Sequence, residues 1–139
     1  MPAANTQFAI AVHLIAALAY RQGSQTCSEE LAGSVNTNAS FVRRILSKLA
    51  KASLVSTAPG KGRNSILAKD PQKITLAEIY RAVDPAPAFS IHPYLPAEGC
   101  FVSNHIKPSL GHVLEKAQGA LEMSLGEVFL SDVMEDMRR

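Results

Sequence analysis

Tryptophan is absent from this chain of 139 residues, and aromatic side chains make up only 6% of it. With so few large rings, the core has to be built from Leu, Ile, Val and Ala, a set that suits packed helices. Apolar residues nevertheless reach 47%, which is too many for a disordered chain. The length fits one ordinary domain, or a small domain with an attached extension.

Long apolar runs and cysteines are also scarce. The longest apolar stretch, from Phe8 to Tyr20, is interrupted by His13 and falls short of the ~18 residues expected of a membrane span. Its flank lacks the basic start of a signal peptide. The two cysteines, Cys27 and Cys100, fit a reducing compartment and give no disulfide framework. We therefore expect a cytoplasmic protein that has no membrane partner.

The sequence contains no grouping of side chains that indicates catalysis. There is no Ser–His–Asp set, no carboxylate pair and no phosphate-binding loop in a strand–helix context. The spacing of His92, Cys100, His105 and His112 matches no compact zinc pattern, so ordinary surface or interface histidines are favoured. We expect a protein that is not an enzyme and that holds no metal and no cofactor.

Basic and acidic side chains are unevenly distributed along the chain. Residues 1–75 hold nine Lys and Arg against three acids, a net charge of +6, whereas residues 76–139 hold five against nine, a net charge of −4. A basic segment attracts a polyanion, and an acidic segment does not. The division indicates that the N-terminal half contacts nucleic acid.

Three helices are predicted at the start of the chain. Apolar residues at helical spacing place the first over residues 6–21. Thr26 and Glu29 have the spacing of a capping box and predict a second helix of about two turns. After a three-residue polar turn, Asn38 is a good N-cap for a third helix over residues 39–51, which has an apolar stripe and a basic face.

A hairpin and a further helix complete the predicted N-terminal domain. Short strands at 54–57 and 65–68 flank a turn rich in glycine and basic residues. A capping box at Thr75 then starts a helix that runs to about Val83. The order of elements predicts a mainly α fold in which residues 1–83 form a winged helix-turn-helix domain with a small β-hairpin wing.

This arrangement suits the reading of a DNA groove. The turn sets the third helix across the second, so that its N-terminal half, with Arg43 and Arg44, can reach base edges in the major groove. Lys48 and the basic turn are placed for phosphates or the adjacent minor groove. The alternative is a plain helical hairpin with a solvated basic face. The residues that we predict to contact DNA are Asn38, Ser40, Phe41, Arg43, Arg44, Ser47, Lys48, Lys61 and Arg63.

The C-terminal half is predicted to be a loop followed by two helices. Residues 84–103 contain four prolines and are expected to be a loop. A long helix is predicted from about Asn104 to Met123, and a capping box at Ser124 predicts a last amphipathic helix. The apolar residues of the long helix recur close to the coiled-coil period of 3.5. These residues are Ile106, Leu110, Val113, Leu114, Ala117 and Leu121.

A second copy of the chain is the expected cover for this apolar stripe. The long helix has nothing else large to pack against, although packing onto its own N-terminal domain is an alternative. Residues 104–139 are then dimerisation helices, and residues 84–103 are the proline-rich loop that precedes them. A homodimer would present two DNA-binding domains to a roughly palindromic site in double-stranded DNA.

Several segments of the chain resemble the Rrf2 class of bacterial winged-helix regulators, the class of IscR, NsrR and CymR. The resemblance covers nearly the whole chain and implies a homodimeric transcription factor, usually a repressor. It implies also that the long C-terminal helix crosses its partner's and that an effector acts near the loop before that helix, which makes residues 84–103 an effector loop. The segments that carry it are Phe8 to His13, Ser34 to Asn38, Val42 to Leu49, Leu54 to Val55, Leu67 to Pro71, Ile74 to Leu76 and Ile79 to Val83.

Two departures from the class bear on function. Members that bind an iron–sulfur cluster carry three cysteines in the segment that is here 97–106, and this chain has only Cys100 there. Because a cluster needs several thiolates, we expect none, and the YwnA-like branch is the closest match. In the wing, Gly60 and Gly62 fit the pattern of the class, but Arg63 and its neighbours replace the rest.

Cys100 has two interpretations. It follows a glycine and precedes a helix start, a position that favours the reactive thiolate, so that an oxidant or electrophile could be sensed there. It could equally be a small apolar residue that is buried. An alternative function for the whole chain is a protein-interaction adaptor that uses a winged helix without binding DNA.

Overall fold

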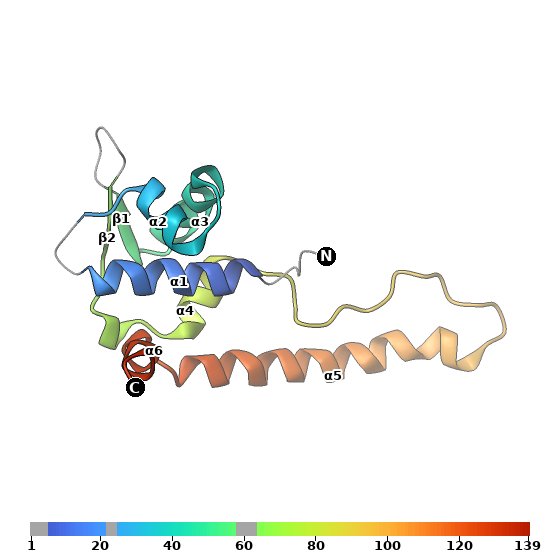
Figure 1. Ribbon diagram of the computed structural model, residues 1–139. Coiled ribbons are helices and arrows are strands. Elements are labelled where there is room, and N and C mark those ends of the chain that lie inside the picture. The colour runs from blue at the N-terminus through green and yellow to red at the C-terminus, as the bar shows by residue number, and fades with distance from the viewer. Residues whose placement is uncertain (1–5, 22–24, 58–63) are drawn as a thin grey trace.

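The computed structural model describes residues 6–21, 25–57 and 64–139. This part of the chain contains six α-helices, a short 3₁₀ helix and one two-stranded sheet. Figure 1 shows a body that contains the first four α-helices, the sheet and the last helix, and an arm that extends away from it. The elements in chain order are α1 (Thr6–Tyr20), α2 (Ser28–Val35), α3 (Ala39–Lys51), β1 (Val55–Thr57), β2 (Ser65–Leu67), η1 (Pro71–Lys73), α4 (Leu76–Ala82), α5 (Phe101–Gly126) and α6 (Leu130–Met137).

Helix α1 is the central helix of the body and contacts α2, α3, α4, α6 and β2. Its Leu14 is fully buried, together with Ile45 of α3, Ile79 of α4 and Leu130 of α6. Burying an aliphatic side chain of this size contributes roughly 1.5–3 kcal/mol. The core is therefore aliphatic and helical, as the composition predicts.

The turn between α2 and α3 is formed by three polar residues. Asn36 ends α2 in the left-handed region, with a φ of 70°, which asparagine tolerates better than most residues. Asn38 then caps α3: its Oδ1 accepts a hydrogen bond from the amide of Phe41 at 2.8 Å. The predicted helix-turn-helix and the cap at Asn38 are both confirmed.

The predicted cap of α2 is wrong by one residue. Cys27, not Thr26, is the N-cap residue, and its Sγ donates to Oε1 of Glu30 at 3.2 Å. Thr26 is instead buried and pairs through its backbone with Ser65 of the sheet. The tertiary pairing with β2 holds Thr26 extended, and this interaction outweighs the local capping pattern.

Strands β1 and β2 form the predicted antiparallel hairpin. Val55 pairs with Leu67, and Thr57 pairs with Ser65. Residues 58–63, between the strands, lie outside the described part of the chain. Lys61 and Arg63, which are predicted to contact DNA, are among them.

Helix α6 belongs to the body. The amide of Leu76 donates to the carbonyl of Val128 at 2.9 Å, and the amide of Leu130 donates to the carbonyl of Ile74 at 2.8 Å. These two bonds connect the start of α6 to the start of α4, where the predicted capping box of Thr75 is present. Leu130 and Met134 lie in the core of the body, so α6 packs with the N-terminal elements, and its assignment to a dimerisation unit stays a prediction.

The start of α6 also differs from the prediction. Residues 124–126 continue α5, and α6 begins at Leu130 with Phe129 as its N-cap residue. The amide of Phe129 donates to Oδ2 of Asp132 at 2.9 Å. The capping box predicted at Ser124 is therefore wrong.

The arm consists of α5 and the segment 84–100, which carries no regular secondary structure and runs beside it (Figure 1). The amide of Ala88 donates to Oε1 of Gln118 at 3.0 Å, and the Ile91 side chain lies over Gly111. The loop was predicted over residues 84–103 and is present over 84–100. Helix α5 starts at Phe101, three residues before the predicted position, and contains Pro108.

Candidate nucleic-acid interface

Helix α3 presents four exposed residues on the side opposite its core contacts: Ser40, Arg44, Ser47 and Lys51. Their spacing of four, three and four residues places them on one face of the helix. We call this set the recognition face. Val42, Ile45, Leu46 and Leu49 form the buried side of the same helix, so the core itself fixes the direction in which the recognition face points.

Arg44 occupies the middle of the recognition face. Its guanidinium carbon lies 5.4 Å from the centre of the Phe41 ring, which is half-buried. Stacking of this kind restrains the arginine without neutralising its charge. Arg44 is therefore held near the N-terminal half of α3 with its hydrogen-bond donors available.

Arg43 lies at the edge of the recognition face toward α2. Its Nη1 is 3.5 Å from Oε1 of Glu29, and its Nη2 donates to Oγ of Ser40 at 3.4 Å. The side chains of Arg43 and Glu29 are 39% and 67% exposed, so the ion pair is weak and easily exchanged for another partner. Arg43 can leave Glu29 for a stronger anion.

Lys48 lies on the opposite edge and turns into the body. Its Nζ donates to Oε1 of Gln7 at 2.9 Å and to the carbonyl of Val83 at 3.5 Å. The structure thus gives Lys48 a role in joining α3 to α1 and to the end of α4, and the phosphate contact expected from the sequence stays a prediction. Lys51, which is exposed at the end of α3, is the lysine that faces outward.

Ser47 and the wing strands share a small cleft. Ser47, Arg43, Thr57 and Ser65 line a hollow of about 220 Å³ between α3 and the sheet. Strands β1 and β2 therefore lie directly beside the recognition face. This juxtaposition of a basic helix and a hairpin is the one that the order of elements predicts.

Comparison with known proteins identifies the chain. The model of the Rrf2 family, described as an iron-dependent transcriptional regulator, matches residues 4–136. The chain belongs to the Rrf2 family. The YwnA protein of Bacillus subtilis (strain 168), described as an HTH-type transcriptional regulator, is 37% identical over 131 residues, which are 94% of this chain and 96% of that protein.

Solved structures agree with membership of the Rrf2 family. A crystal structure described as a DNA-binding protein is 35% identical and has a TM-score of 0.71, covering 92% of this chain and 98% of that one. CymR of B. subtilis, described as the global cysteine regulator, is 19% identical with a TM-score of 0.68, covering 97% and 98%. The second likeness shows the fold alone. Because Rrf2 proteins are transcriptional regulators, the expectation that this chain is not an enzyme is confirmed.

The iron that the Rrf2 description implies does not fit the donors of this chain. Within residues 6–21, 25–57 and 64–139, no three His, Cys, Asp or Glu side chains are grouped closely enough to hold a metal ion. The two thiols are far apart in the fold, with Cys27 before α2 in the body and Cys100 at the outer end of α5 in the arm. An iron–sulfur cluster needs several thiolates at one place.

Cys100 is the exposed N-cap residue of α5, and its Sγ accepts a hydrogen bond from the amide of Ser103 at 3.4 Å. In the single chain it is not the buried apolar residue of the second interpretation. The Sγ atom is therefore open to reagents in solution.

The predicted dimerisation stripe is not covered by the chain itself. Helix α5 contains no buried residue. Leu110 and Leu114 are half-buried beside the segment 84–100, whereas four residues are exposed: Ile106, Val113, Ala117 and Leu121. Of the two alternatives for the stripe, packing onto the chain's own N-terminal domain does not occur along most of the helix. In the described part of the chain, no helix is long and apolar enough to cross a membrane.

Proposed function

We propose that this protein is a cytoplasmic homodimer that binds double-stranded DNA through α3 and represses transcription from the bound promoter. The observation that carries the proposal is the exposed recognition face, with Arg44 stacked on Phe41 at its centre and a wing beside it. An α-helix of this kind fits the major groove, and its N-terminal half meets base edges. Arginine is the side chain that recognises guanine most often.

The residues of α3 have distinct roles in this proposal. Arg44 and, after release from Glu29, Arg43 contact bases, while Ser40, Ser47 and Lys51 contact phosphates. Asn38 and Phe41 act indirectly, because one caps α3 and the other supports Arg44. Lys61 and Arg63 of the wing are proposed to contact the DNA backbone or the neighbouring minor groove.

Dimerisation follows from the uncovered face of α5. Helix α5 contacts α4 near its C-terminal end, but none of its 26 residues is buried, and an amphipathic helix requires a cover for its apolar side. A second copy supplies an identical apolar stripe. The resulting two-fold symmetry gives a pair of recognition faces and a roughly palindromic operator.

Charge reversal on α3 tests the DNA-binding proposal. Arg44→Glu is expected to abolish the gel shift of the promoter region of the protein's own gene, while the circular dichroism spectrum stays unchanged because Arg44 is exposed. Lys73→Glu, an exposed residue of η1, is the matched control and should still bind. Retained binding by Arg44→Glu would reject the groove assignment. A wild-type protein that binds no duplex at low salt would favour the adaptor function instead.

Repression has its own test. A reporter fused to the bound promoter should be expressed more strongly when the gene for the protein is deleted, and restored by the wild type but not by Arg44→Glu. Lower expression after deletion would make the protein an activator.

We propose further that Cys100 makes the protein responsive to oxidants. Its exposed thiolate attacks a peroxide oxygen and the O–O bond breaks, which leaves a sulfenic acid on the protein and releases hydroxide. Hydrogen peroxide is expected to change the DNA affinity of Cys27→Ser but not of Cys100→Ser. Equal responses of the two variants would remove Cys100 from the mechanism.

A further inference from the structure

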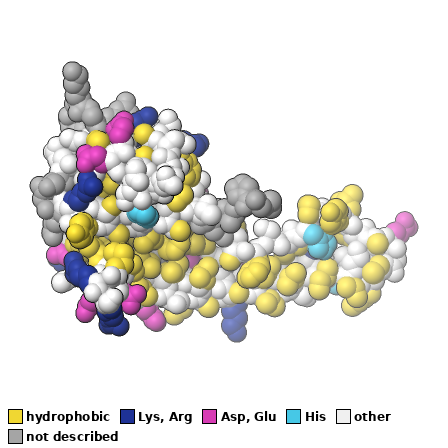
Figure 2. All heavy atoms as spheres, viewed as in Figure 1, with side chains coloured by type: hydrophobic (Ala, Val, Ile, Leu, Met, Phe, Trp, Pro, Cys, Tyr) yellow, Lys and Arg dark blue, Asp and Glu magenta, His cyan; other side chains and the backbone are white. Residues whose placement is uncertain are grey.

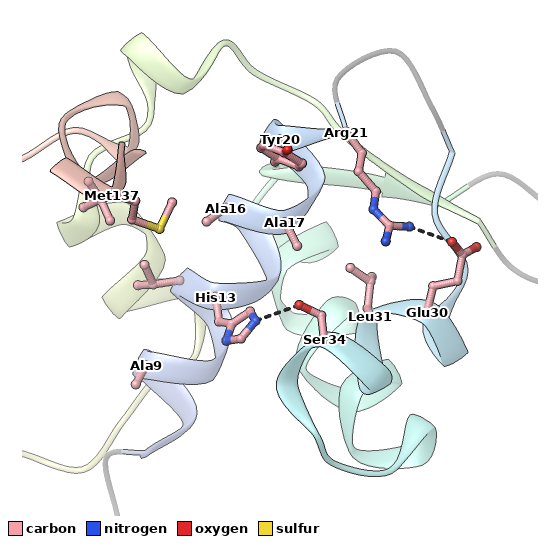
Figure 3. A pocket seen from close by; sticks show the side chains of 12 residues that line it. Ala9, His13, Ala16, Ala17, Tyr20, Arg21, Glu30, Leu31, Ser34 and Met137 are labelled. Atoms are coloured by element: carbon pink, nitrogen blue, oxygen red, sulfur yellow. Dashed lines mark hydrogen bonds and ion pairs between the residues drawn. The ribbon is translucent and has the colours of Figure 1, made fainter. Parts of the chain in front are cut away.

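A pocket opens on the body where α1, α2 and α6 meet. It has a volume of about 500 Å³, within the range of cavities that hold small organic molecules. Figure 3 shows its floor along α1, with Leu31 and Ser34 of α2 on one side and Met137 of α6 on the other. All of its lining residues belong to these three helices except Arg21, which directly follows α1. We call this cavity the α1–α2–α6 pocket.

The floor of the pocket is built from small apolar side chains. Ala9, Ala16 and Ala17 of α1 line it, and their short methyl groups let an occupant approach the helix closely. Tyr20 and Met137, which also line the pocket, are 79% and 60% exposed. A phenol ring and a thioether both make favourable contacts with aromatic rings, in addition to the burial of apolar area. This lining favours an aromatic occupant.

The charged groups of the pocket are paired with each other. Nη1 of Arg21 donates to Oε2 of Glu30 at 2.6 Å, and the two side chains are 46% and 51% exposed. The pKa of Glu30 is lowered, first by the hydrogen bond from Cys27 and then by that from Arg21, so its carboxylate stays charged at neutral pH. An anionic ligand would meet this carboxylate and a cationic ligand would meet the guanidinium. An uncharged ligand is therefore favoured.

The imidazole of His13 has a hydrogen-bonding nitrogen to spare. Its Nε2 is 2.9 Å from Oγ of Ser34, the interaction drawn in Figure 3. Within residues 6–21, 25–57 and 64–139, its Nδ1 has no hydrogen-bond partner. The Ser34 hydroxyl can donate to Nε2 or accept from it, so Nδ1 can act as an acceptor or as a donor. A hydroxyl group on the ligand, which itself donates and accepts, matches either state.

The pocket is separate from the effector loop that the family resemblance implies. That loop, residues 84–103, belongs to the arm, which Figure 1 shows extending away from the body. On the face seen in Figure 2, the arm carries apolar side chains of its own, outside the body. A ligand in the α1–α2–α6 pocket would therefore act on the body directly.

Helix α2 connects the pocket to the recognition face. It forms one wall of the pocket and also contacts α3. Ser34, which lines the pocket, lies two residues before Asn36, the residue that ends α2. Glu29, next to the lining residue Glu30, holds Arg43 of α3. A ligand that binds one position of α2 better than another shifts the population toward that position, and its effect on DNA affinity follows by linkage.

We propose that the α1–α2–α6 pocket binds a small, uncharged aromatic molecule that carries a hydroxyl group, and that the bound molecule changes the affinity of α3 for DNA. The ring lies over the alanines of α1, its hydroxyl group meets His13, and its edge contacts Met137. A phenol of ordinary acidity has these properties, because it is uncharged at neutral pH. The regulation rests on the proposed DNA-binding function, whereas the binding of the phenol does not.

Two methionines of the chain allow the site to be located by NMR, with β-naphthol, a two-ring phenol, as the probe. Met137 and Met123 are both exposed, at 60% and 72%, but Met137 lines the pocket whereas Met123 lies on α5. The full-length protein is isotope-labelled at its methionine methyl groups, and Met137→Leu assigns the signal of Met137. The ligand control is β-naphthoate, which has the same two rings and a negative charge in place of the hydroxyl group.

The expected result is a saturable shift of the Met137 methyl signal and a nuclear Overhauser contact between this methyl group and the naphthol, without a comparable change at Met123. The naphthoate should bind at least tenfold more weakly. His13→Phe keeps a ring but loses the hydrogen bond, so it should weaken naphthol binding about fivefold, whereas His92→Phe, the matched control in the arm, should not. The proposed site would be overturned by no response at Met137, equal responses at both methionines, equal binding of the naphthoate, or unchanged binding by His13→Phe.

Gel shifts with and without saturating β-naphthol test the regulation. The affinity of the wild type for the promoter region should change at least threefold, and that of His13→Phe should change less at the same naphthol concentration. An unchanged affinity while naphthol occupies the pocket would overturn the regulation. A protein that shows the Met137 response but binds no DNA, with or without naphthol, would contradict the proposed function and with it the regulation, and would leave the binding site supported.

Discussion

Nζ of Lys48 lies 2.9 Å from Oε1 of Gln7, a residue 41 positions earlier in the chain, and 3.5 Å from the carbonyl oxygen of Val83. Two neighbouring lysines of α3 thus have different environments. Lys48 holds the base of the recognition helix to α1 and to the carboxyl end of α4, where a positive charge is favourable. Lys51, one turn later, is exposed.

Lys48→Met is predicted to lower stability more than DNA affinity. Loss of a half-buried, charge-assisted hydrogen bond costs about 1 kcal/mol, which a shift of the urea midpoint would reveal. Lys51→Met is the matched control: its stability should change by less than about 0.5 kcal/mol, while its DNA affinity and the salt dependence of binding both decrease. If Lys48→Met weakened DNA binding without changing the urea midpoint, Lys48 would contact phosphate after all.

Glu29→Gln is predicted to strengthen DNA binding. Glu29 holds Arg43 across 3.5 Å and carries a negative charge close to the recognition face. Removing the charge frees the arginine and lowers repulsion of phosphates, so the dissociation constant should fall severalfold at low salt. Stability should hardly change, because the ion pair is exposed. Glu115→Gln, on the arm, is the control for the change in net charge, and an equal gain there would exclude the local explanation.

The capping box of α4 predicts a pH dependence. Burial opposes ionisation of Glu78, but hydrogen bonds from Lys69 and from the amide and hydroxyl of Thr75, together with the charge of Lys69, outweigh it, so the pKa of Glu78 is lowered from 4.5. A lowered folded-state pKa contributes stability that is fully present above the ordinary value and is lost as the pH falls through the lower one.

Glu78→Gln is the variant that measures this contribution. The difference in free energy of unfolding between wild type and variant should be constant at neutral pH and should shrink as the pH falls below about 4.5. Urea titrations at a series of pH values give the comparison. If the difference in free energy of unfolding between wild type and variant grew as the pH falls, the carboxylate would destabilise the helix cap.

Val113→Glu is predicted to separate the subunits. Val113 is 61% exposed in the single chain and lies in the middle of the apolar stripe of α5, so a carboxylate costs nothing in the monomer and is buried twice in the dimer. Analytical ultracentrifugation should show a monomer, and the affinity for a two-site operator should fall by more than tenfold. Lys116→Glu, exposed on the same helix, is the control and should stay dimeric.

The local sequence is informative where a short pattern decides the structure. Asn38 after a polar turn, Thr75 three residues before Glu78, and the prolines between residues 84 and 100 each act through their own backbone or that of near neighbours. The helix-turn-helix, the hairpin and the long loop could therefore be predicted, as could the exposure of Arg44 from the apolar stripe on the other side of α3.

Other features depend on residues that are distant in the chain. Thr26 starts a sequence pattern typical of a helix cap but pairs with Ser65. Ser124 starts the same pattern but remains within α5. Lys48 has the appearance of a phosphate-binding residue, yet its ammonium finds Gln7. A capping or charge pattern indicates only which contacts a side chain is able to make. The position of elements that are distant in the chain determines which contact it makes.

The sequence by itself determined that this chain forms an aliphatic, helical body with one basic helix. Hydrophobic periodicity and helix caps determine these elements through residues that are close together in the chain. Only the tertiary structure decided that α6 packs into the body while most of the apolar stripe of α5 stays exposed. The difference between the two helices depends on which apolar faces meet in space. Leu130 of α6 is buried in the core of the body, whereas Val113 of α5 is exposed to water.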